Sequence, residues 1–535
     1  MEAQDIHRRR TFTSASNVSS VPLEASRSKL SRYDTRLSAR QKINQRLDVA
    51  RIRLEKYQKR WSEIGQELPP QINRRHVSVI SIGGVIGTGL YIGTAPALQH
   101  AGPLGTLIGY IITGTIVWSV VISIGEIVAF VPNVGGPVGL AGLYVDPALG
   151  FALGWNAWYN WSIILPTELS AAAILFNGFF PNASDPYIRN SNLITVTVLL
   201  ILAVGINCFG SRAYGEAEFF FSCFKILTIV GLIITGIIID LGGGKHGYIG
   251  FRNWKNPGPF VQYRGIKGSL GKFLGVWSSM IQAVFAFFGT EVPGVAAGEV
   301  QNPAKNIPRA VNRVWIRITL FYVLAVFVAG LLVGSDELAV PGNTSKNGKS
   351  PGSLQAYSSP FVIAMQKSGI KVLPHICNAA FVISAFSAAV SDVYISSRFL
   401  YYLARCGHAL KFCAGIFRSE RNKTVIPWVG VLVSASFAML AYMSVSASVG
   451  AEQIFHWLSS LNTTTALLAW IGMLFTYLRW YQGTVTAENR EPDFKAKHSE
   501  DIYKNRYRLQ PWIAIYAFVM CVLILIFNGW YVFTR

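Results

Sequence analysis

The stretch SIGGVIGTGLYIG, residues 81–93, is apolar enough to lie in lipid, yet it carries glycine at positions 83, 84, 87, 89 and 93. So many glycines would break a helix in water. Inside a bilayer every backbone polar group needs a partner, so irregular backbone is tolerated only where it faces protein or a water-filled cavity. The stretch therefore either packs helices closely through small residues or forms an unwound hinge whose free N–H groups bind an anion.

The composition around this stretch is that of a membrane protein. The chain of 535 residues is 51% hydrophobic and 14% charged, with a mean hydropathy of +0.36. A helix needs about 20 apolar residues to cross a bilayer, and such runs recur between Val77 and Thr534. They predict an all-α polytopic protein with about eleven spans, near residues 77–98, 104–131, 151–180, 193–209, 217–240, 273–294, 314–334, 374–403, 427–447, 454–478 and 510–533.

We interpret the net charge of +21 as a sign of how the chain is oriented in the membrane rather than of nucleic-acid binding. Lysine and arginine gather in the first 76 residues and in alternate loops, which predicts a cytoplasmic N-terminus. One loop, near residues 241–272, is basic although this orientation places it outside, whereas the sequons at Asn182 and Asn343 fall in outside loops as expected. The six cysteines lack CxxC spacing and predict neither a disulfide framework nor a metal site.

Residues 1–76 are predicted to form a cytoplasmic tail ahead of a membrane domain at 77–535. The first part, to about residue 38, is serine-rich and basic, which is typical of disorder. Apolar residues then recur at spacings of four and three among basic ones: Ile43, Leu47, Ala50, Leu54, Tyr57 and Trp61. This basic amphipathic helix lies on the anionic inner leaflet, is merely solvated, or binds regulatory cytosolic partners.

A second break occurs in FAFFGTEVPG, residues 285–294, where Gly289, Pro293 and Gly294 interrupt the sixth span. The two breaks lie five helices apart, and discontinuous helices at matching positions of two halves indicate a transporter site between inverted repeats. This favours the hinge at residues 81–93 over simple packing. Broken helices expose N–H groups on one side and carbonyls on the other, so the expected ligand is a small zwitterion.

Four segments resemble fungal amino-acid permeases of the amino acid–polyamine–organocation (APC) superfamily, of the yeast amino acid transporter type. They are GGVIGTGLYIG in the first span, GEIVAFVPNVGGP with VDPALGFALGWNAWYNW, FFGTEVPGVAAGEVQNPAKNIPRAV in the sixth span, and ISAFSAAVSDVYISSRFLYYLA in the eighth. The resemblance covers roughly residues 75–535. It implies a LeuT-type five-plus-five inverted repeat that imports amino acids across the plasma membrane by alternating access, driven by the proton gradient and without a cofactor.

The resemblance also implies a substrate site at the two breaks. The substrate carboxylate would meet amides around Gly84, Val85, Gly87, Thr88 and Gly89. The amino group would meet carbonyls near Phe285 and Phe288, with Gly289 and Thr290 in the same site and Phe285 closing over the substrate as a gate.

Two ionisable residues within spans are candidates for proton coupling. Lys225 is the only lysine deep in the fifth span, and burial disfavours a charged amine, which favours proton exchange over snorkelling to the interface. Glu291, in the sixth-span break, would carry the coupled proton or hold the hinge by hydrogen bonds. We interpret Glu168 and Glu126 as structural, and Asp392 with Arg398 as a gate or orientation contact.

Three tryptophans follow one another at spacings of three in the third span. Trp155, Trp158 and Trp161 are interpreted as interfacial belt and packing. Relatives commonly have asparagine where Val390 stands, so we expect a polar contact to be missing there. The family has twelve spans, whereas this chain ends at Arg535 after the eleventh; a lost twelfth helix, natural or from a wrong gene model, is the simplest account.

Other functions are weighed against import. A non-transporting amino-acid sensor on the permease fold, signalling through its tail, is the alternative. An enzyme is not expected, because GTGLYIG lacks the strand–turn–helix context of a dinucleotide site and no His/Cys/Glu cluster has metal spacing.

Overall fold

The computed structural model describes residues 86–131, 136–180, 185–245, 247–290, 311, 313–338, 359–419, 424–445, 451–491, 493, 495, 502–504 and 506–530. The chain divides into two compact units, Met1–Lys56 and Tyr57–Arg535, and all the described residues belong to the second. The predictions for the tail, for both outside sequons, and for Gly84, Val85 and Glu291 fall outside the described residues.

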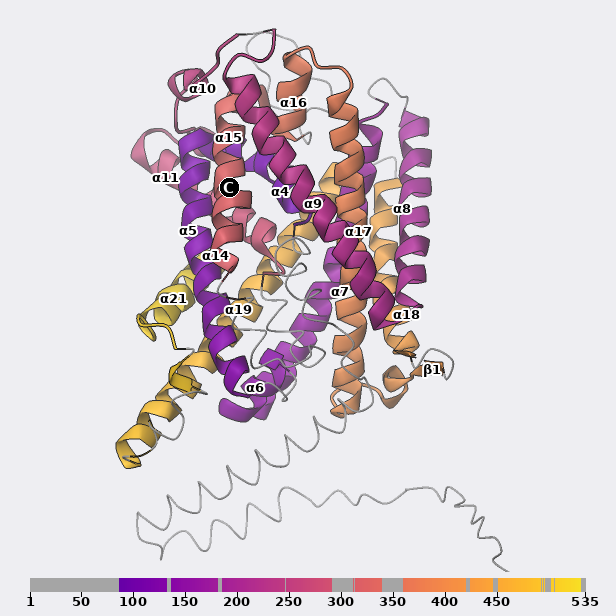
Figure 1. Cartoon of the computed structure of the whole chain (residues 1–535), viewed down its shortest axis with the longest axis vertical. Helices are drawn as coiled ribbons and strands as arrows, with labels where there is room; N and C mark the ends of the chain where they lie inside the picture. The colour runs from indigo at the N-terminus through magenta and orange to yellow at the C-terminus, as the bar shows by residue number, and fades with distance from the viewer. Residues whose placement is uncertain are drawn as a thin grey trace, which may run out of the picture. The chain divides into compact units, whose positions relative to one another are not determined.

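Long helices form nearly all of the described structure (Figure 1). They are α5 (Thr94–Phe130), α7 (Pro147–Asn177), α8 (Asp185–Asn207), α9 (Ser211–Asp240), α11 (Gly268–Phe287), α17 (Leu373–Arg405), α19 (Ala451–Arg490) and α21 (Trp512–Ile526). Shorter helices are α4 (Thr88–Tyr91), α6 (Gly136–Tyr144), α10 (Arg252–Lys255), α14 (Val314–Arg317), α15 (Leu324–Leu332), α16 (Pro360–Lys367) and α18 (Trp428–Ser436).

Tighter or wider helical turns also occur among the described residues. They are η2 (Tyr263–Gly265), η4 (Ile318–Val323), η5 (Ser335–Leu338), η6 (Lys411–Ala414) and η7 (Phe437–Val445). Within the described ranges, the strands are β1 (Phe417–Ser419) and β2 (Thr424–Ile426), an antiparallel pair with Arg418 opposite Val425. The all-α prediction therefore holds apart from this small hairpin.

Eight helices among the described residues are long and apolar enough to cross a membrane. The count differs from the predicted eleven for local reasons, since each predicted span contains helical residues. The end of the first span and the whole second span are counted together in α5, but the backbone is not helical at Gly102 (φ 75°, ψ 172°), where two helices meet. Helix α7 is long enough but carries several polar side chains, and α21 is apolar but has only 15 residues.

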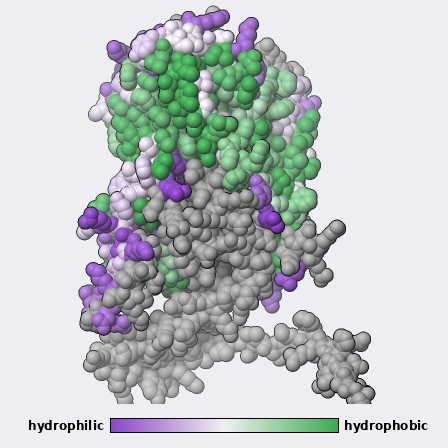
Figure 2. All heavy atoms as spheres, in the orientation of Figure 1, coloured by the Kyte–Doolittle hydropathy of each residue, from purple (hydrophilic) through white to green (hydrophobic). Residues whose placement is uncertain are grey.

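The outer face of the bundle is apolar. On α8 and α9, Ile201 is 65% exposed and Leu227 is 71% exposed, and neighbouring isoleucines and valines on these helices are exposed as well. Figure 2 shows hydrophobic residues covering a broad band on the side where α9 crosses the front of the bundle. Exposed apolar area of this size matches a lipid environment rather than water, so the protein is an integral membrane protein.

Both predicted breaks appear in the backbone. Helix α4 starts only after Gly87, whose backbone is extended (φ −111°, ψ −165°). Helix α11 ends at Phe287, and Gly289 then takes φ 84°, a conformation that favours glycine. The breaks meet in space, because a Cβ on Gly89 would lie 2.7 Å from Cα of Ala286. Around this junction α7 packs against α17 and α19, and α11 packs against α5.

Candidate functional site

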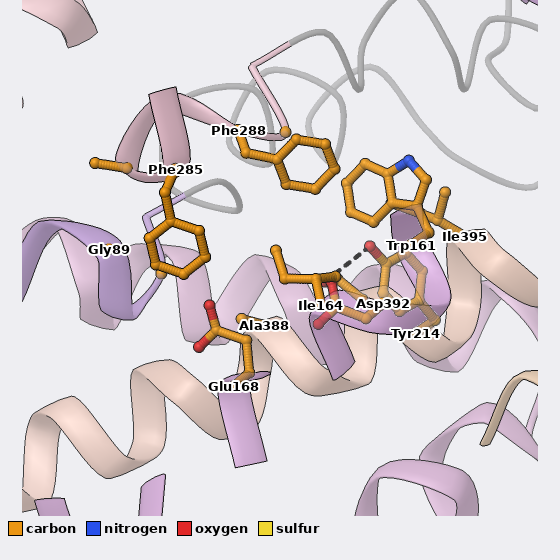
Figure 3. A pocket seen from close by; sticks show the side chains of 14 residues that line it. Gly89, Trp161, Ile164, Glu168, Tyr214, Phe285, Phe288, Ala388, Asp392 and Ile395 are labelled. Atoms are coloured by element: carbon orange, nitrogen blue, oxygen red, sulfur yellow. Dashed lines mark hydrogen bonds between the residues drawn. The ribbon is translucent and has the colours of Figure 1, made fainter. Parts of the chain in front are cut away.

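A cavity of about 40 Å³ lies where the two breaks meet (Figure 3). Its walls come from the segment at α4 and from α7, α9, α11 and α17. The lining residues are Gly87, Gly89, Trp161, Ile164, Glu168, Tyr214, Phe285, Ala286, Phe288, Gly289, Ala388, Ser391, Asp392 and Ile395. Segments up to about 300 residues apart in the sequence thus build one pocket, which is the arrangement expected of a site between helical repeats.

At the first break, close neighbours leave little room for a side chain larger than that of glycine at positions 87 and 89. A Cβ on Gly87 would lie 2.8 Å from Oε1 of Glu168, and a Cβ on Gly89 would lie 3.1 Å from the ring of Phe285. Any side chain at these positions would fill space that the pocket walls already use. The small residues let a carboxylate from α7 and an aromatic ring from α11 approach the backbone.

Aromatic rings cover one side of the pocket. Trp161 and Phe288 lie with ring centroids 4.7 Å apart, and Phe285 meets Phe455 of α19 edge to face at 5.8 Å. Figure 3 shows Phe285, Phe288 and Trp161 along the same edge of the cavity. These contacts hold the rings in place and exclude water from that edge. Phe285, the predicted gate, is therefore positioned between the pocket and α19.

Two carboxylates from different helices face the pocket. Glu168 of α7 is 2% exposed and Asp392 of α17 is 3% exposed. Glu168 Oε2 and Asp392 Oδ2 have no hydrogen-bond partner among the described residues. A buried polar atom without a partner costs free energy, so these oxygens favour a donor or a cation in the cavity. Sequence reasoning assigned Glu168 to structural bonding and Asp392 to a gate, and missed that both line the pocket.

The other predicted substrate residues lie in or beside the pocket. Gly289 is in the wall, while Thr88 and Thr290 are fully buried next to it without lining it. The Thr290 hydroxyl donates to the carbonyl of Phe287. The carbonyl of Phe285 accepts a hydrogen bond from the N–H of Phe288 at 3.3 Å, so one of its two lone pairs is already used.

Lys225 lies outside the pocket lining and is completely buried. The expectation that it does not snorkel to the surface agrees with this burial. Its Nζ lies 3.6 Å from Oε1 of Glu218, a residue two helical turns earlier that is also completely buried. Sequence reasoning missed Glu218, although a spacing of seven residues on one helix puts both side chains on the same face.

The positions of Tyr214 and Val390 relative to the pocket are also set by the tertiary structure. The Tyr214 hydroxyl lines the pocket and donates to Ser391 Oγ at 3.2 Å, the dashed line in Figure 3. Val390 is fully buried and does not line the pocket, and its carbonyl accepts from Asn207 at 3.0 Å. The backbone of Val390 therefore contacts α8, and its side chain does not line the cavity.

Trp155, Trp158 and Arg398 make their contacts outside the pocket lining. Trp155 and Trp158 meet edge to face and donate to His408 O and Ser434 Oγ, respectively. Of the three tryptophans taken for belt and packing, Trp161 alone lines the pocket. The guanidinium of Arg398 lies over the ring of Tyr394, and it donates to Ser211 at 2.9 Å.

The comparisons with known proteins agree with this architecture. A family model described as amino acid permease matches residues 76–535. An uncharacterized amino-acid permease of Schizosaccharomyces pombe is 39% identical over 472 residues, covering 88% of this chain and 85% of the relative. The dicarboxylic amino acid permease of Saccharomyces cerevisiae is 36% identical, covering 87% of this chain and 72% of the relative. The lysine-specific permease of the same organism is 36% identical, with coverages of 86% and 70%.

These matches extend over the whole membrane domain and confirm the resemblance drawn from the motifs. The chain therefore belongs to the amino acid permease family, as a fungal-type permease of the amino acid–polyamine–organocation superfamily.

Proposed function

We propose that the protein imports amino acids across the plasma membrane by alternating access, driven by the proton gradient. Family membership supports amino-acid import. The observation that carries the proposal is a pair of buried carboxylates, Glu168 and Asp392, at a pocket between two broken helices. Each carboxylate has an oxygen without a hydrogen-bond partner among the described residues. This pocket would offer carboxyl oxygens to the ammonium of a zwitterion and backbone N–H groups to its carboxylate.

The substrate would lie with its ammonium toward Glu168 and Asp392. Its carboxylate would meet the N–H groups around Gly87 and Gly89, where the chain enters helix α4. The rings of the pocket edge would cover its carbon atoms. The relatives carry names for a dicarboxylic substrate and for lysine, so family membership leaves the side chain of the substrate open.

The proton coupling is assigned to Lys225. A buried charge needs a partner of opposite charge, and Glu218 Oε1, 3.6 Å from Nζ of Lys225, supplies one. Glu291 is the second candidate for the coupled proton.

Uptake of a panel of labelled amino acids tests the proposal. The protein is expressed in cells that lack their own permeases, and its amount at the surface is measured. Import is expected to be stronger at acidic than at neutral external pH and to collapse with a protonophore. Equal uptake at both pH values in the presence and absence of protonophore would contradict proton coupling, although it would leave amino-acid transport in place.

The sensor alternative is tested by deleting residues 1–76. A carrier keeps its flux without the tail once surface amounts are matched, whereas a sensor loses its output. Absence of any uptake from full-length protein at the surface would favour the sensor.

A further inference from the structure

Glu218 is a buried carboxylate of α9 that joins two helices. Its Oε2 accepts from Ser387 at 2.8 Å and from Ser391 at 3.2 Å, both on α17. Its Oε1 accepts from Ser222 at 3.2 Å and lies 3.6 Å from Nζ of Lys225. Glu218 and Lys225 are both completely buried. Glu218 thus receives three hydroxyl donors and lies beside the lysine.

A continuous set of polar contacts connects this pair with the pocket. Ser391, which donates to Glu218, also lines the pocket and accepts from Tyr214. The next residue, Asp392, carries one of the two pocket carboxylates. Neighbouring turns of α17 therefore line the pocket, where the substrate is expected, and donate hydrogen bonds to Glu218.

Several other charged or titratable groups face this region. From α17, Asp392 interacts electrostatically with both members of the pair, and from α7 Glu168 interacts with Lys225. Tyr214 interacts with Glu218, and it also faces Tyr394 and Arg398 of α17. Lys225 has no hydrogen bond among the described residues, so its ammonium depends chiefly on the carboxylates around it.

We propose that Glu218 shares the coupled proton with Lys225 and makes its release depend on the position of α17. This inference rests on the proposed function and adds a positioning residue to it. With Ser387 and Ser391 in place, the pair is a carboxylate and an ammonium. When α17 withdraws these hydroxyls, the carboxylate loses two hydrogen-bond donors, an N–H bond of Lys225 breaks, and an O–H bond forms on Glu218.

The proton balance follows from the two forms of the pair. Ammonium with carboxylate and amine with carboxylic acid both hold one transferable proton and have no net charge. Release of that proton to water on the inner side leaves an amine and a carboxylate, with a net charge of −1. A proton from water on the outer side restores the loaded pair. Substrate bound against α17 would thus control proton release through the position of Ser387 and Ser391.

The test compares Glu218→Gln with the wild type in accumulation and in exchange. Accumulation of a labelled substrate against its gradient depends on the proton, whereas exchange of external label for internal unlabelled substrate does not. Glu218→Gln is expected to lose accumulation, to the level of wild type with protonophore, and to keep exchange. Its uptake should no longer depend on external pH. Glu218→Asp should recover part of the accumulation, because it restores a carboxylate.

Two further variants keep the test decisive if Glu218→Gln fails to reach the surface. Ser387→Ala removes one donor from Glu218 without touching the pocket lining, and it should shift the pH profile of uptake while exchange persists. Glu216→Gln changes an exposed carboxylate on the same helix and should leave accumulation and pH profile unchanged.

The outcomes separate this inference from the proposed function. The role of Glu218 alone would be overturned if the wild type shows proton-dependent accumulation and Glu218→Gln keeps the same accumulation and pH profile. If Glu218→Gln is absent from the surface, the same result in Ser387→Ala would overturn it. Wild-type uptake that ignores pH and protonophore would instead overturn the proposed coupling.

Discussion

Nε of Arg506 lies 3.1 Å from Oε1 of Glu126, so the segment after α19 is tied to the last turns of α5. Tyr477 donates to the other carboxylate oxygen at 2.9 Å, and Arg506 also donates to Thr484 at 2.8 Å. Glu126 is almost completely buried, whereas Arg506 is 13% exposed. The carboxylate thus serves a structural purpose, in line with its interpretation from the sequence.

Replacing Arg506 with alanine should destabilise the protein. The change leaves the Glu126 carboxylate buried without its cation, with hydrogen bonds from the Tyr477 hydroxyl and the backbone of Tyr507. Breaking a buried ion pair on one side costs about 3–5 kcal/mol. Thermal unfolding of the detergent-purified protein should therefore occur at a clearly lower temperature. The double variant with Glu126→Gln should recover much of the loss, and an equal loss in the double variant would contradict this account.

Gly89→Ala should impair folding and uptake together. The added Cβ would lie 2.7 Å from the backbone of Ala286, which cannot move without shifting α11. Overpacking of this kind costs about 1–3 kcal/mol, and here it also pushes apart the two breaks that form the pocket. Uptake and thermal stability are both measured. Gly231→Ala on α9 is the matched control, because a Cβ there meets nothing within 4 Å and should be tolerated.

Asp392→Asn should weaken substrate binding more than it lowers the amount of protein at the surface. The substitution keeps the shape of the side chain but replaces the carboxyl group that faces the pocket with an amide. The Michaelis constant for uptake is expected to rise at least about tenfold, which corresponds to the loss of a charge-assisted contact of roughly 1.5–3 kcal/mol. Asp336→Asn, at an exposed position in η5, provides the comparison. An unchanged Michaelis constant would remove Asp392 from the substrate site.

Phe285 and Phe455 should act as a pair in closing the pocket. Their edge-to-face contact joins α11 to α19, and aromatic pairs contribute about 0.5–1.5 kcal/mol beyond their buried area. Phe285→Leu and Phe455→Leu should each accelerate loss of bound labelled substrate. The double variant should be less impaired than the sum of the two effects, as for residues in contact. Strict additivity would show that the two rings close the pocket independently.

Part of the site could be predicted because its signals are local. Glycine at 87 and 89, and the glycine after Phe288, mark positions where the backbone leaves the helix, and these residues meet at the cavity. Lys225 was found as a lone cation in an apolar run, and its burial agrees with that interpretation. Glu218 could have been found by the same logic, since it lies two turns before Lys225 on one helical face.

The remaining features depend on how helices face one another. Asp392 looked like a gate residue because its spacing to Arg398 lies on one helix, but the packing of α17 against α7 turns it toward Glu168 and the cavity. Val390 looked like a lost substrate contact, yet its side chain lies outside the pocket lining.

The sequence by itself determined that the chain is a helical membrane protein with two broken helices, since hydropathy, glycine and proline act on each segment separately. It also carried the family, through motifs that are contiguous in the chain. The tertiary structure decided which polar groups meet: Glu218 with two serines of α17, and Glu168 with Asp392 across the pocket. Residue spacing defines the faces of one helix, whereas the rotation and depth of its neighbour come from packing, which no single segment encodes.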